Sequence, residues 1–203
     1  MRIIRGASFE EFVRWYLARE GRKRKQNQDL TGRSWESLLA EMRHSEGGKL
    51  RPWFEGALWS IASFDTVAEA MSLVCVDNWQ TRGSRLVTGV GSDNRLARTL
   101  VAAARETGYF DNHTLMKSNS VERHNRQERI DAFRRNWVPL QDDERLTVCD
   151  LNAAEKAESP GGTYYLHDGF GRLLAYLYLV VYEKQQYRPI EVFMCQEMQS
   201  QAT

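Results

Sequence analysis

The sequence predicts an α+β fold, in which a small mixed sheet with helices is preceded by a helical N-terminal region. Amphipathic segments dominate the first 110 of the 203 residues, and short β-branched or aromatic runs gather after that point. A glycine-rich turn and a wholly apolar segment separate the last two of these runs. We therefore expect a helical region over residues 1–110 and a second domain over residues 111–203, packed together as one unit.

Helical periodicity is clearest near the N-terminus. Ser8 followed by Glu11 is a capping-box pattern, and Gly21 ends the apolar stripe that begins after Ser8. The run 73–76 fits either a strand or a helix end. Helices are predicted for residues 8–20, 34–44, 52–63, 66–71 and 92–106.

The second half begins with a predicted helix that Pro139 ends and continues with strands and one buried helix. The buried helix has apolar residues on every face, which is typical of a helix enclosed by other elements. The predicted order is helix 126–137, strand 145–151, strand 163–166, elbow 168–172, helix 173–182 and strand 190–194.

Composition excludes several classes of protein. The 28 basic and 27 acidic residues nearly cancel, so the chain is neither a bulk polycation nor an acidic tail protein. A hydrophobic content of 42% excludes general disorder. The longest apolar run, 173–182, is about half of what a bilayer requires, and the N-terminus has no signal-peptide pattern. We expect a cytoplasmic protein without membrane insertion.

The elbow Asp168-Gly169-Phe170-Gly171-Arg172 carries the clearest chemistry. Its glycines allow the backbone to approach a phosphate, and the amides of the following helical turn favour negative charge. Arg172 would add a guanidinium, and Asp168 would hold a metal ion or orient a water molecule. The alternative is a tight turn at Asp168-Gly169 with Arg172 on the surface.

Residues 161–176, which read GGTYYLHDGFGRLLAY, resemble the signature of the ParB/sulfiredoxin superfamily. That signature is a strand, a glycine-containing elbow that ends in arginine, and a helix. The flanking helix, proline and strands agree with it, so the resemblance covers roughly residues 115–196. Sulfiredoxins carry a catalytic cysteine where Phe170 stands, and partition proteins carry an arginine patch that is absent here. The resemblance therefore points to the compact plasmid or phage branch, which includes the fertility-inhibition (oncogenic-suppression) proteins.

The resemblance implies that the elbow binds the phosphates of ATP or another nucleotide, and that residues on the approach to the elbow complete the site. For each approach residue, a solvated helix start is the alternative. The implied set comprises nucleotide-binding Gly169, Phe170, Gly171, Arg172, Arg123 and Arg126, catalytic Asp168, Arg172 and Glu122, and Asp168 as the ligand of Mg²⁺ or Mn²⁺.

The activity implied by this branch is metal-dependent ATP hydrolysis with DNA nuclease activity, interfering with plasmid or phage DNA transfer. Nucleotide and DNA are the expected partners, and a protein of DNA transfer or replication is a further candidate. One alternative is a nucleotide-dependent kinase of the same fold. Another is a non-catalytic inhibitor that docks on a protein through the tryptophan-rich N-terminal half.

DNA contact is predicted for the basic run Arg22, Lys23, Arg24 and Lys25, for which a solvated loop is the alternative. The nearby aromatic residues are candidates for stacking on bases, but Tyr16 and Trp35 fall on apolar stripes, which favours packing in the core for these two. These residues are Trp15, Tyr16 and Trp35.

The remaining motifs have simpler interpretations. Residues 88–93 precede a predicted helix but lack a Walker A ending, so a capped turn is expected. The acidic run 142–144 is interpreted as an exposed turn or a divalent-ion site, and His167 as a structural residue or a base. The three cysteines lie far apart among apolar residues, which favours buried free thiols over a nucleophile.

Overall fold

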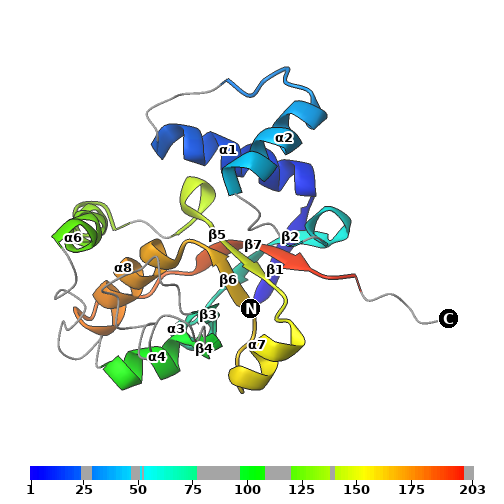
Figure 1. Ribbon diagram of the computed structural model, residues 1–203. Helices are drawn as coiled ribbons and strands as arrows, with labels where there is room; N and C mark the ends of the chain where they lie inside the picture. The colour runs from blue at the N-terminus through cyan, green and yellow to red at the C-terminus, as the bar shows by residue number, and fades with distance from the viewer. Residues whose placement is uncertain are drawn as a thin grey trace.

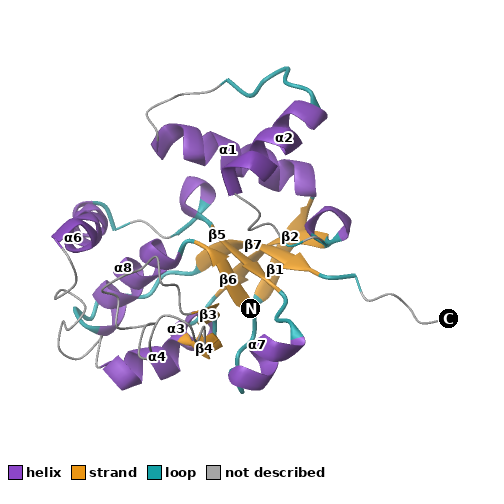
Figure 2. Ribbon diagram, viewed as in Figure 1, coloured by secondary structure: helices purple, strands orange, loops and turns teal. Residues whose placement is uncertain are grey.

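A central sheet separates two groups of helices in the computed structural model (Figures 1 and 2). The model describes residues 1–23, 29–46, 51, 53–76, 97–107, 120–137 and 140–198. Over these residues the chain is a three-layer arrangement of helices, mixed sheet and helices, and the predicted α+β class is confirmed.

Helices and strands are interspersed along the whole of the described chain. The strands are β1 (Arg2–Ala7), β2 (Leu58–Phe64), β3 (Val74–Val76), β4 (Ala97–Thr99), β5 (Leu146–Cys149), β6 (Tyr165–Asp168) and β7 (Ile190–Gln196). The α-helices are α1 (Phe9–Lys23), α2 (Trp35–Glu46), α3 (Val67–Met71), α4 (Leu100–Thr107), α6 (Ser120–Arg135), α7 (Ala153–Glu158) and α8 (Phe170–Val181). Two short 3₁₀ helices are η1 (Phe54–Gly56) and η4 (Asp142–Glu144).

The sheet combines strands from both halves of the chain in the order β1-β2-β7-β5-β6-β3-β4. Strands β5 and β7 run parallel, with Leu146 opposite Val192 and Cys149 opposite Cys195, and β3 runs parallel to β6. The other pairs are antiparallel. Residues 1–110 therefore contribute four strands as well as helices, which corrects the expectation of a purely helical N-terminal region.

Two predicted helices are wrong in part because strand pairing overrides local periodicity. Residues 52–63 were expected to be helical, but β2 occupies Leu58–Phe64 and lies between β1 and β7. Its apolar side chains are buried on both faces, which hides the alternation that marks a half-exposed strand. In the predicted helix 92–106, Ala97–Thr99 instead forms β4 and α4 begins at Leu100.

Successive side chains of the central strands enter two separate apolar cores. In β2, Ile61 packs towards the α1 and α2 side, whereas Ala62 packs towards α8. In β7, Phe193 packs in the core on the α1 and α2 side, and Met194 packs in the core on the α8 side. Figure 1 shows α1 and α2 over one face of the sheet and α8 with α6 and α4 over the other. Both faces of the central strands are therefore covered.

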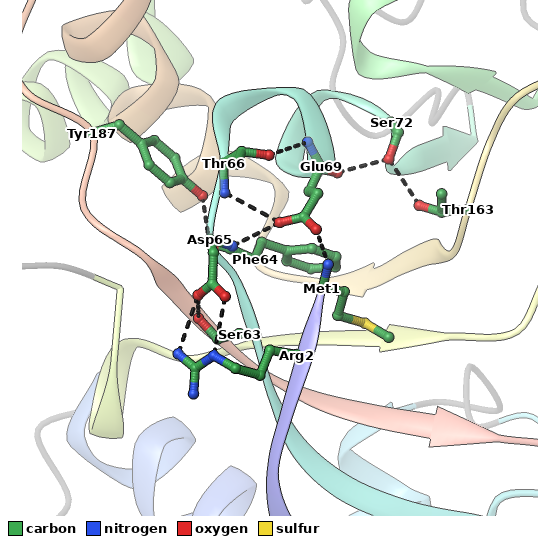
Figure 3. Close-up of polar contacts among 10 residues, drawn as sticks. All are labelled: Met1, Arg2, Ser63, Phe64, Asp65, Thr66, Glu69, Ser72, Thr163 and Tyr187. Atoms are coloured by element: carbon green, nitrogen blue, oxygen red, sulfur yellow. Dashed lines mark hydrogen bonds and ion pairs between the residues drawn. The ribbon is translucent and has the colours of Figure 1, made fainter.

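The first strand is joined to the rest of the molecule by a polar corner, which Figure 3 shows. The amino group of Met1 pairs with Glu69, and Arg2 donates to Asp65. Glu69 is also the third residue of a capping box with Thr66 at the start of α3. One short segment, residues 65–69, thus terminates β2, starts α3 and holds the beginning of β1.

Helix α8 is the centre of the larger core. Its residues 172–180 are all buried, as its uniformly apolar sequence predicts. Tyr176 carries the main polar contact within this environment, because its hydroxyl donates to the Arg188 carbonyl at 2.7 Å and accepts from the Arg188 amide at 2.8 Å. The Trp137 ring stacks on Tyr176 at 4.9 Å. None of the helices described is long and apolar enough to cross a membrane.

We expect Tyr176→Phe to lower the free energy of unfolding by about 1–3 kcal/mol, because it removes both partners of the Arg188 backbone from a buried position. Denaturant titration measures this change. Tyr164→Phe is the matched control, since its hydroxyl makes no hydrogen bond within the described part of the chain. Equal effects of the two substitutions would contradict the role given to the Tyr176 hydroxyl.

Candidate functional site

The elbow, residues 168–172, links the end of β6 to the start of α8. Gly169 is the N-cap residue with a φ of 102°, a conformation that favours glycine, and a Cβ there would collide with Leu146. Its carbonyl accepts from the amides of Arg172 at 3.0 Å and Leu173 at 2.9 Å. The amides of Phe170 and Gly171 come before Arg172, the first intrahelical donor. Gly169, as the N-cap residue, has no side chain to cap them. The helix therefore presents backbone donors at the elbow.

Arg172 lies within the elbow and is buried. Its guanidinium donates to Asp168 at 2.9 Å and to Glu144 at 3.4 Å. Only 10% of its side chain is exposed, so the alternative in which Arg172 is a surface residue is wrong. The elbow thus contains an internal ion pair between its first and last residues.

Arg19 reaches the same carboxylate from helix α1. It donates to Oδ2 of Asp168, the oxygen that also accepts from Arg172, and to Glu20 at 3.1 Å. Its guanidinium lies over the Trp15 ring at 4.8 Å. The residue is 3% exposed, and its buried Nε has no hydrogen-bond partner among the described residues. The site therefore holds two buried arginines around one carboxylate oxygen, with one donor unused.

Arg129 brings a third guanidinium to the first turn of α8. A Cβ on Gly171 would collide with Nη1 of Arg129, so this side chain lies directly against the glycine. The close packing of α6 against α8 places it there (Figure 1). A side chain at Gly171 would therefore have to displace the end of Arg129, whereas glycine at position 169 is favoured by its backbone conformation.

The two buried arginines differ in how well their charge is compensated. Burial lowers the pKa of Arg19, but Asp168 and Glu20 more than offset this effect and the pKa is raised overall. Burial also lowers the pKa of Arg172, the nearby charge of Arg19 lowers it further, and the acids do not compensate. Asp168 and Glu144 therefore offset only part of the effect of burial on Arg172.

Only some of the other predicted site residues lie within the described part of the chain. Glu122, Arg123 and Arg126 lie in α6, which begins earlier than predicted, but their side chains are outside the described part of the chain. Helix α1 continues past Gly21 to Lys23, and Arg22 is exposed near its end. The Lys23 side chain and the residues Arg24, Lys25 and 88–93 lie outside the described residues.

The acidic and aromatic motifs have structural partners. Asp142 and Glu144 of η4 pair with Arg145 and Arg172 at 3.0 and 3.4 Å. His167 packs against the Phe54 ring at 5.0 Å, which supports its structural interpretation. The core interpretation is confirmed for Tyr16 and Trp35, which belong to or pack against the core on the α1 and α2 side of the sheet, and Trp15 packs against the same core.

A metal site at Asp168 does not fit the donor set that surrounds it. Two guanidinium groups occupy its Oδ2, and a divalent cation there would meet the positive charges of Arg19 and Arg172. Nowhere in the described ranges do three His, Cys, Asp or Glu side chains gather as metal ligands would. We therefore derive no chemical step through a metal ion at Asp168, and Mg²⁺ or Mn²⁺ dependence stays a prediction.

Sequence reasoning missed Arg19 and Arg129 as members of the site. Arg19 follows Phe12 and Tyr16 at helical spacing, so a charged residue stands on the buried stripe of α1. That placement was the available signal. Arg129 follows the predicted Arg126 by three positions on α6, which puts both on one side of the helix. No family model, curated protein or solved structure matches the chain, so the function is argued from this geometry.

The two elbow glycines should respond differently to alanine. Gly169→Ala should lower the free energy of unfolding by about 1–3 kcal/mol because its φ is positive. Gly171→Ala should change it by less than about 1 kcal/mol, since the Arg129 side chain is flexible and alanine favours the helix. Denaturant titration of both variants checks this difference, and an equal cost would contradict the assigned backbone role of Gly169.

The cysteines should be unreactive in the folded protein. All three are buried and free, and burial raises the pKa of Cys149 to about 12. Cys75 and Cys195 are covered as well. We expect negligible labelling by a thiol reagent at pH 8 and labelling of all three thiols after denaturation. Rapid labelling of any cysteine in the folded protein would indicate a reactive nucleophile and would contradict this expectation.

Proposed function

We propose that the elbow binds the phosphate groups of a nucleotide and that the protein is a nucleotide hydrolase of the ParB/sulfiredoxin type. The observation that carries the proposal is the convergence of Arg172, Arg19 and Arg129 on the N-terminal turn of the buried helix α8. Backbone amides at a helix start and guanidinium groups are the donors that phosphate prefers.

The same arrangement suits phosphoryl transfer to water. Negative charge spreads over the oxygens of the transferred group in the transition state, and fixed cations stabilise it. Arg19 and Arg172 are held by burial, so little reorganisation is needed when that charge develops. In hydrolysis, water forms a bond to the terminal phosphorus while the bond to the leaving oxygen breaks, giving inorganic phosphate and the shortened nucleotide. The elbow cations would stabilise both the substrate and this charge.

DNA is the second proposed ligand class. Arg22 lies three residues beyond Arg19, so the basic run that begins at Arg22 starts close to the elbow along the same helix. A nucleic-acid strand that met this end of α1 would have its phosphates near the elbow. This placement supports the proposed DNA nuclease activity and interference with plasmid or phage DNA transfer.

A non-catalytic role is the alternative that one observation favours. Arg172 and Arg19 both pair with Asp168. A purely structural role, in which this pairing joins α1 to the elbow, is sufficient to explain it. In that case the protein would act by docking on another protein. Measurements on the Arg172 variant separate the two candidates.

Arg172→Ala should abolish nucleotide binding and hydrolysis because it removes the elbow cation nearest the α8 amides. Binding is measured by calorimetry with ATP. Phosphate release is measured with ATP, and conversion to nicked or linear DNA is measured with supercoiled plasmid, each with Mg²⁺, with Mn²⁺ and with a chelator. Arg51→Ala is the control, since Arg51 is a half-buried arginine that pairs with Glu155 at 2.6 Å beside the start of β6.

Loss of binding in Arg172→Ala alone, with both variants folded by circular dichroism, would support the proposal. Full activity of the Arg172 variant would overturn the phosphate assignment. The absence of any nucleotide binding by the unmodified protein would leave the docking alternative.

A further inference from the structure

Asp168 contacts its two arginines in the way that a bound anion would contact them. One oxygen, Oδ2, accepts from Nη1 of Arg19 and from Nη2 of Arg172. Arg19 comes from α1 and Arg172 from α8, so the carboxylate bridges two elements that are far apart in the chain. An anion with the same donors would have to take the place of this oxygen.

We propose that Asp168 occupies the place of a terminal phosphate group, which displaces the carboxylate from Arg19 and Arg172 when it binds. The inference rests on the proposed function, and it deepens that function by naming the ligand class and the group that competes with it. The ligand class is a phosphate monoester, as at the end of a nucleotide or of a 5′-phosphorylated strand.

Exposure gives the direction from which the ligand enters. The side chains of Arg19 and Arg172 are 4% and 10% exposed, whereas that of Asp168 is 28% exposed. Solvent therefore reaches this group of charges from the carboxylate side, and an incoming anion meets Asp168 first. The same exposure gives the displaced carboxylate a position in water, where its charge is solvated.

Charge and donor number favour a phosphate monoester over the carboxylate. A phosphate monoester carries close to two negative charges at neutral pH, since its second pKa is about 6, whereas a carboxylate carries one. Two guanidinium groups converge on the place of the carboxylate oxygen, and this pair of donors suits the ligand with the higher charge. The buried Nε of Arg19 has no partner within the part of the chain that the structure describes, and an extra phosphate oxygen would be an acceptor for it.

The burial of the arginines also favours a terminal phosphate over an internal phosphodiester as the group that displaces Asp168. A phosphodiester carries one charge and is flanked by sugars on both sides. Two side chains with so little exposure are reached by the end of a ligand more readily than by the middle of a strand. The elbow should therefore distinguish a strand with a 5′-phosphate from the same strand without it.

Asp168→Asn tests the proposal because it keeps the shape of the side chain and removes the competing charge. If the carboxylate occupies the arginines nine-tenths of the time, the apparent affinity rises about tenfold on its removal. We expect at least this gain for inorganic phosphate, for ATP and for a short 5′-phosphorylated oligonucleotide, and no gain for the unphosphorylated oligonucleotide. Calorimetry measures the four affinities in the unmodified protein and the variant.

Glu183→Gln is the matched control. Glu183 pairs with Arg134 beyond the other end of α8, so its neutralisation alters an ion pair away from the elbow. We expect no change in any of the four affinities. Equal gains in both variants would indicate a general effect of net charge and would overturn the inference.

The stability of the Asp168 variant provides a second measurement. Without Asp168, Arg19 and Arg172 face each other without their shared acid, so Tm should fall, and added phosphate should restore it more than added chloride does. If the variant does not fold without an added anion, the refolding yield in phosphate is compared with the refolding yield in chloride. Failure of phosphate to restore it would overturn the inference.

The outcomes distinguish the inference from the proposed function. If the unmodified protein binds phosphate in an Arg172-dependent way and Asp168→Asn binds it no more tightly, the displacement is wrong and the phosphate site stands. If neither protein binds any of the phosphates, both are wrong. Binding by the variant alone would be the strongest support for a carboxylate that occupies the site.

Discussion

Asp168 lies between two buried arginines, and this pairing determines how the N-terminal helix meets the elbow. A guanidinium buried without an acid would be strongly unfavourable, so Arg19 requires Asp168 and the end of α1 has to lie beside β6. Arg172 turns back from the first turn of α8 to the same oxygen. The position of α1, the end of β6 and the start of α8 are thus joined through one carboxylate. Any ligand that takes this place alters the contact between them.

The sheet makes this contact possible because both halves of the chain belong to it. Strand β7, near the C-terminus, lies between β2 from the first half and β5 from the second. Helix α1 packs over these strands through Phe12, whose ring centroid lies 5.6 Å from that of Phe193 in β7. The phosphate site we propose is therefore built on the shared sheet. Residues 1–64 are part of its support as well as a source of one of its cations.

Local charge matters more here than net charge. The chain carries a formal charge of only +1, and its second half is acidic. At the elbow, Arg19, Arg129 and Arg172 converge near the amides of α8, while Asp168 and Glu144 offset them in part. Fixed charges in a site of low exposure act far more strongly than the same charges in water. A nearly neutral protein can therefore gather several buried guanidinium groups, together with their acids, in one site.

The sequence by itself determined the features that depend on neighbours in the chain. Ser8 accepts from the Glu11 amide at 3.0 Å as the cap predicts, Gly169 adopts the conformation that only glycine takes easily, and α8 is buried as its apolar sequence requires. Tertiary structure alone decided that residues 58–64 form a strand and that Arg19 joins Asp168, 149 positions away. Strand pairing and buried ion pairs depend on partners that are distant in the chain, and local periodicity contains no information about which partner is chosen.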